Sequence, residues 1–100
     1  MKLSTNIKRY IFILLSFFIG MSVYSQKQAD NKKAYEYNNK GKEYYNKSNY
    51  DKAIKYYNKA IKLNFDNMEI YNDMGMVYEK QENYRKAFEC YQKVVDLNYL

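Results

Sequence analysis

The chain has 100 residues with no proline, three glycines and one cysteine, and its formal net charge is +6. This length allows one small domain, and the shortage of helix breakers favours long helices. A single cysteine excludes an intrachain disulfide, and the absence of histidine removes the commonest general base and neutral metal ligand. We therefore expect no catalytic residues, no metal site and no cofactor.

Residues 1–25 differ in composition from the rest of the chain. Three basic residues precede an uncharged apolar run, and small residues follow it. This order is typical of a secretory signal peptide, with cleavage between Ser25 and Gln26. Residues 11–24 fall short of the roughly 20 apolar residues that span a bilayer, so an N-terminal membrane anchor is the alternative. We expect export to the periplasm or the medium.

Residues 26–33 are polar and show no periodicity, so they predict a short frayed lead-in. A first helix is predicted over 34–46, where Tyr37, Gly41 and Tyr44 recur at spacings of four and three. A glycine inside a helix costs about 1 kcal/mol relative to alanine. Because Gly75 recurs at the matching place further on, we expect that two helices cross closely at each glycine.

A second helix is predicted over 50–63, with Asn49 as its N-terminal cap. Its apolar residues follow three-four spacing. These residues are Tyr50, Ala53, Ile54, Tyr57, Ala60 and Ile61. Asp66 and Glu69 fit a capping box at the start of a third helix, predicted over 67–80.

A fourth helix is predicted over 84–97, with Asn83 as its cap. It carries Cys90, which we interpret as a small buried apolar residue. It also carries apolar residues on more than one side, since Phe88, Tyr91, Val95 and Tyr99 cannot all face the third helix. An uncovered apolar strip favours self-association, so we expect a weak homodimer or a poorly stable monomer.

Two stretches of the chain, 41–64 and 75–98, repeat one another at a constant offset of 34 residues without a gap. The matching pairs include Gly41 with Gly75, Tyr44 with Tyr78, Ala53 with Ala87, and Tyr57 with Tyr91. A fixed period of this length indicates one supersecondary unit made twice.

This unit resembles the tetratricopeptide repeat (TPR), whose period is 34 residues. The first copy would cover 34–67 and the second 68–100. The sequence departs from the family pattern before the glycine, where a large apolar residue is expected, because the first copy has Lys40 and the second has Met74. The resemblance implies an all-α fold of antiparallel helix-turn-helix repeats, a short α-solenoid. The residues expected to pack the repeats are Gly41, Tyr44, Ala53, Tyr57, Gly75, Tyr78, Ala87 and Tyr91.

In the family that this chain resembles, the first helix of each repeat lines a concave groove that takes a peptide or a partner helix. The residues expected on that face are Tyr35, Asn38, Lys42, Tyr45, Glu69, Asn72, Met76 and Glu79. Asn amides there could pair with a peptide backbone in both directions. The family's carboxylate-gripping variety is not reproduced, because Asp73 stands at one of its positions and would repel a carboxylate.

These features indicate an exported, non-catalytic scaffold whose partner is a protein or peptide. The alternative is a truncated N-terminal sensory region of a longer TPR-containing signalling or regulatory protein. Residues 34–67 carry a net charge of +3 and residues 68–100 carry −2, which lacks the strong basic stripe of a nucleic-acid binder. We expect no nucleic-acid partner, and no membrane contact after signal cleavage.

Overall fold

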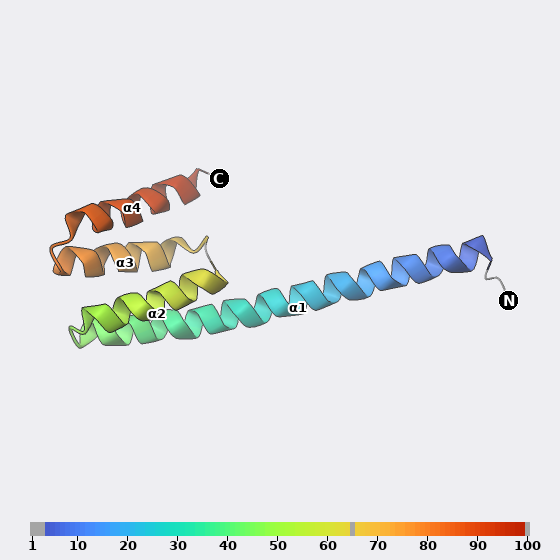
Figure 1. The fold of residues 1–100 in the computed structure, drawn as a ribbon, viewed down its shortest axis with the longest axis horizontal. Helices are drawn as coiled ribbons and strands as arrows, with labels where there is room; N and C mark the ends of the chain where they lie inside the picture. The colour runs from blue at the N-terminus through green and yellow to red at the C-terminus, as the bar shows by residue number, and fades with distance from the viewer. Residues whose placement is uncertain (1–3, 65, 100) are drawn as a thin grey trace.

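The computed structural model describes residues 4–64 and 66–99, which form four α-helices joined by short turns (Figure 1). The helices are α1 (Thr5–Asn46), α2 (Tyr50–Leu63), α3 (Met68–Lys80) and α4 (Tyr84–Asn98). α1 pairs with α2, α3 pairs with α4, and α2 packs against α3 (Figure 1). The predicted all-α architecture of two helix pairs is therefore confirmed.

The first helix is much longer than the sequence predicted. The frayed lead-in over 26–33 is wrong, because α1 runs without a break from Thr5 to Asn46, a total of 42 residues. No glycine or proline interrupts the stretch between Gly20 and Gly41, and Gln26 Nε2 donates a hydrogen bond to Asp30 Oδ1 at 2.9 Å. Since each added residue extends a helix once it has nucleated, a polar stretch without breakers continues it.

The N-terminal half of α1 projects away from the other three helices (Figure 1). Its large apolar side chains are exposed, from 42% at Ile11 to 72% at Phe12. By length and composition α1 could cross a membrane, a property that a signal sequence near an N-terminus shares. The first three residues of the predicted leader lie outside the described part of the chain.

Asparagines cap three of the helices. Asn49 Oδ1 accepts from the backbone N–H of Lys52, and Asn83 Oδ1 accepts from that of Lys86, as the sequence predicted. At α3 the predicted Asp66 cap is wrong, because Asn67 Oδ1 accepts from the Glu69 N–H at 3.0 Å. The backbone of Asn67 is extended and the helix begins one residue later, at Met68, so Asn67 holds the cap position.

The two helices of each pair meet at a glycine. A Cβ atom placed on Gly41 would lie 2.5 Å from Cε1 of Tyr57, and one on Gly75 would lie 2.5 Å from Cε1 of Tyr91. Ala53 is fully buried and Ala87 is 3% exposed. The core around these contacts consists of Ala34, Ala53, Tyr57, Ala60, Ile70, Met74, Val77 and Cys90. Each crossing therefore depends on a tyrosine ring lying flat where the facing helix has no side chain.

We predict that Gly41→Ala destabilises the fold, although alanine is the better helix former. Its methyl group would overlap the Tyr57 ring, which is 2% exposed, so the ring would have to shift out of its packed position. Overpacking of this kind costs about 1–3 kcal/mol, measurable by urea denaturation followed by circular dichroism.

Gly20→Ala is the matched control, because a Cβ atom at Gly20 would have no neighbour within 4 Å. It should leave stability unchanged or raise it slightly. If both variants unfold like the wild type, the crossing of α1 and α2 does not depend on the glycine.

Candidate functional site

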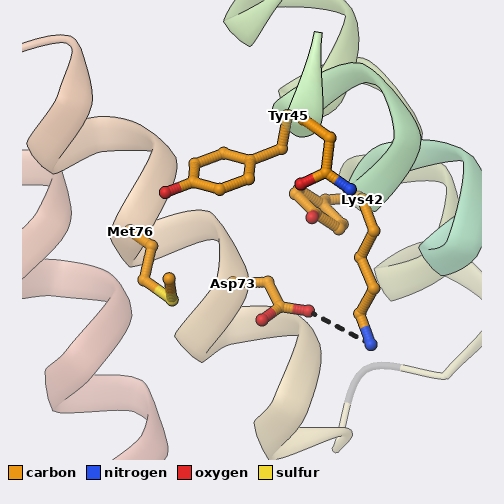
Figure 2. Close-up of a pocket in the computed structure, with 6 residues that line it drawn as sticks. Lys42, Tyr45, Asp73 and Met76 are labelled. Carbon is orange, nitrogen blue, oxygen red and sulfur yellow. Dashed lines mark ion pairs between the residues drawn. The ribbon is translucent and has the colours of Figure 1, made fainter. Parts of the chain in front are cut away.

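A pocket of about 220 Å³ opens between α1 and α3. Lys42 and Tyr45 extend into it from α1, and Asp73 and Met76 face them from α3 (Figure 2). Asn46 and Tyr57 complete the lining. The pocket thus combines three large side chains with apolar surface and a charged rim.

The repeat geometry explains why these residues meet. Lys42 and Met76 occupy equivalent positions, one repeat apart, on the first helix of each pair. Tyr45 lies three positions after Lys42 on α1, and Asp73 lies three positions before Met76 on α3. Residues at this spacing point to the same side of a helix. The pocket therefore forms where equivalent faces of α1 and α3 lie side by side.

The rim holds one positive and two negative groups. Lys42 Nζ donates a hydrogen bond to Glu69 Oε1 at 2.5 Å and lies 3.9 Å from Asp73 Oδ2. The bond to Glu69 raises the pKa of Lys42 above its ordinary value. Burial raises the pKa of Asp73, and the Glu69 charge acts in the same direction, while Lys42 opposes both. Since Lys42 bonds to Glu69, the Asp73 carboxylate is only partly compensated.

Two buried oxygen atoms near α1 and α3 accept no hydrogen bond within the described part of the chain. They are Asn38 Oδ1 and Asp73 Oδ2. Asn38 is 3% exposed, so its predicted place on the open groove face is wrong. Its side chain falls on the same helical stripe as Ala34 and Gly41, which is the buried stripe of α1. Sequence spacing alone had assigned Asn38 to the exposed groove face instead of to this neighbouring, buried face.

The other predicted groove residues surround the pocket or remain open to solvent. Lys42, Tyr45 and Met76 line it, and Glu69 holds its rim. Three further residues are exposed but do not line it: Tyr35, Asn72 and Glu79. Sequence reasoning missed Asn46 and Tyr57 as lining residues, whereas it had placed Asp73 in the groove, at a position of the family's carboxylate-gripping variety.

The chemistry of the pocket suits binding. Tyr45, Tyr57 and Met76 offer apolar surface to an incoming side chain, and the polar rim can orient it. Among the described residues, no group of three or more His, Cys, Asp or Glu could hold a metal ion. Cys90 is buried, and burial raises the pKa of its thiol, which is the setting of an unreactive cysteine.

Comparison with known families gives two overlapping matches. A family model described as TPR repeat matches residues 41–82, and one described as Tetratricopeptide repeat matches residues 69–98. Together they span more than half of the chain, from the glycine of the first helix crossing to the end of α4. No curated protein matches the sequence.

The partly compensated Asp73 leads to a pH-dependent prediction. Because its folded-state pKa is raised, ionisation of Asp73 costs stability above that pKa, and the cost disappears below the unfolded-state pKa. Asp73→Asn should therefore melt higher than the wild type at neutral pH. The difference should shrink as the pH falls through the range in which aspartate titrates.

Thermal unfolding at a series of pH values tests this, with the exposed Asp96→Asn as the control for loss of one negative charge. A neutral-pH melting temperature below that of the wild type would mean that the ion pair with Lys42 outweighs the burial of Asp73.

Proposed function

This chain belongs to the tetratricopeptide repeat family, and from that premise we propose that it binds a partner polypeptide along the groove between α1 and α3. Repeats of this family suggest protein–protein interaction and are typically non-catalytic. The observation that carries the proposal is the pocket between the two helices, with its apolar lining and charged rim.

The pocket accepts one apolar side chain of the partner. The side-chain amides of Asn72 and Asn46 next to it form hydrogen bonds with the partner's backbone. Met76 is 38% exposed and lies next to Asn72, whose Nδ2 is 4.0 Å from the methionine sulfur. Asn46 lines the pocket from the opposite helix, α1, and is exposed. Asparagine side chains both donate and accept, so they can follow a peptide in extended form. The partner is thus a protein segment with an exposed apolar residue.

Met76→Ala should weaken partner capture on the order of tenfold, because it removes the most accessible apolar side chain of the pocket. The full chain, immobilised through its C-terminus, would be incubated with proteins from the same compartment, and bound proteins would be quantified by mass spectrometry. Val95→Ala tests the competing surface, since Val95 is a similarly exposed apolar residue on α4, at 47%. Partners lost with Val95→Ala but retained with Met76→Ala would place the binding face on α4 and reject the groove.

We further propose that the protein is exported and acts outside the cytoplasm. The support is the order of the leader, with basic residues before the apolar run and small residues after it. Within its described residues, the large apolar side chains of that segment are exposed and none belongs to the core, so their removal would not open the core. A retained membrane anchor is the competing proposal.

Mass spectrometry of the exported fraction should find an N-terminus at Gln26. Signal peptidases favour small residues before the cut, and Val23 and Ser25 fit those positions. Ser25→Tyr should block the cut and leave the full chain in the membrane fraction, whereas Ser22→Tyr should not. Wild-type protein that keeps Met1 and sediments with membranes would favour the anchor.

We also propose weak self-association through α4. Tyr84, Phe88 and Val95 on this helix are exposed, at 66%, 66% and 47%. Their equivalents one repeat earlier, Tyr50, Ile54 and Ile61, pack against the core. The exposed strip on α4 thus repeats a surface that is used for packing within the same chain, and a second copy can cover it.

Sedimentation equilibrium of the exported chain should show a monomer–dimer equilibrium that Phe88→Gln shifts to monomer. Lys55→Gln, a change at an exposed position on α2, is the control. A concentration-independent monomer with a sharp melt would reject self-association.

A further inference from the structure

Alternating lysine and tyrosine side chains form one continuous face along α1 and α2. On α1 they recur at spacings of four and three residues, and on α2 they do the same, so each set forms a single stripe. We call this the Lys/Tyr face, and its members are Lys33, Tyr37, Lys40, Tyr44, Lys47, Lys52, Tyr56 and Lys59.

The tyrosine rings join the two stripes. The ring centroids of Tyr44 and Tyr56 are 5.3 Å apart with nearly parallel planes, and those of Tyr37 and Tyr56 are 6.1 Å apart. The lysine Nζ atoms lie over these rings, from 5.1 Å for Lys59 over Tyr56 to 6.0 Å for Lys33 over Tyr37. Such cation–π contacts hold the ammonium groups in an ordered layer on half-buried aromatic side chains.

The positive charge of this layer is largely uncompensated. Within residues 4–64 and 66–99, only Lys47 of the five lysines has an ion-pair partner, Glu43 at 2.8 Å. A sixth lysine, Lys62, borders the same face, where it helps to line a hollow of about 240 Å³ beside Lys33 and Tyr37. The face therefore carries an excess of positive charge, which Glu43 lowers beside Lys40 and Lys47.

Solubility alone does not explain this pattern. In the second repeat, the positions equivalent to Lys40 and Tyr56 are Met74 and Cys90, which are buried in the core. The end of a repeat array needs a polar surface where no further repeat packs. Any polar residues would meet that need, whereas five lysines gathered around three tyrosines make a surface suited to an anionic partner.

We propose that the Lys/Tyr face lies on the surface of a bilayer that contains anionic lipids. Lysines attract anionic headgroups, and tyrosine suits the boundary between headgroups and acyl chains. In the chain that keeps its leader, the exposed apolar segment of α1 ends at Tyr24, roughly 14 Å along the helix before Lys33, so the face begins close to any membrane that this segment contacts.

A nucleic acid fits this face less well than a membrane does. Single-stranded nucleic acids gain affinity by stacking bases on free aromatic rings. Here the rings of Tyr44 and Tyr56 stack on each other, and ammonium groups lie over all three tyrosines. The Lys/Tyr face is a second surface, separate from the proposed groove, and membrane binding through it does not depend on the groove. This proposal departs from the expectation of no membrane contact after signal cleavage.

Residue-resolved lysine acetylation of the full chain tests the proposal. The chain would be bound to vesicles of phosphatidylcholine alone, or of phosphatidylcholine with about one third phosphatidylglycerol, and each site would be followed by mass spectrometry. Lys40, Lys52 and Lys59 should react roughly fivefold more slowly on the anionic vesicles, the factor expected for a lysine held at an anionic surface. Equal rates on the two vesicles would overturn the proposal.

Lys80, Lys86 and Lys93 are internal controls and should react at the same rate on both vesicles. Lys86 and Lys93 are especially apt, since they stand one repeat after Lys52 and Lys59. If acetylation of these control lysines slowed together with that of the Lys/Tyr face, the cause would be a general charge effect, and the proposal would also be overturned.

Matched triple variants give a second readout, the vesicle-bound fraction at increasing salt. Lys40→Gln, Lys52→Gln and Lys59→Gln combined should remove the preference for anionic over neutral vesicles, while the same three changes at Lys80, Lys86 and Lys93 should retain it. The corresponding triple arginine variant of the face keeps the positive charge and should also keep the preference for anionic vesicles. Loss of binding to single-stranded DNA by the face variant, without any vesicle preference in the wild type, would assign the face to nucleic acid instead.

Discussion

The whole fold depends on one contact made twice, a tyrosine ring against a glycine backbone. Tyr57 covers Gly41 and Tyr91 covers Gly75, and in each case even a methyl group would be too large. The contact sets how closely the two helices of a repeat approach. It is costly in local terms, because glycine weakens a helix, and it persists because the aromatic ring buries far more surface than a methyl group.

The same contact also shapes the pocket between α1 and α3. Tyr57 reaches across from α2 to Gly41, and its ring also lines the pocket between α1 and α3. The rim is built from residues that the repeat places opposite one another, so its charges interact across the two units. Lys42 from the first repeat bonds to Glu69 of the second, which leaves Asp73 half-buried with incomplete compensation. One side chain, that of Tyr57, thus serves both the packing of the repeat and the lining of the pocket.

The two repeats have equal architecture but different surfaces. The first carries lysines over stacked tyrosines, whereas the second places Met74 and Cys90 in the core, at the positions that match Lys40 and Tyr56. The departure of Lys40 from the family pattern follows from this difference. Met74 must be apolar because it is enclosed, while Lys40 is exposed and carries its charge over the Tyr56 ring.

The sequence by itself determined the helices of the repeats, their order and their crossing points, because a 34-residue period, three-four spacing and recurrent glycines are local signals. It placed α2 at Tyr50–Leu63 as the structure has it, and it identified the Asn49 and Asn83 caps. It also identified Lys42, Tyr45 and Met76, three of the pocket residues. Tertiary structure alone decided the remainder: Asn38 turned into the buried stripe, Tyr57 entered the pocket, and stripes from two helices joined into one Lys/Tyr face. The physical reason is that spacing along one helix defines its faces, whereas the face that is covered depends on how neighbouring helices pack against it.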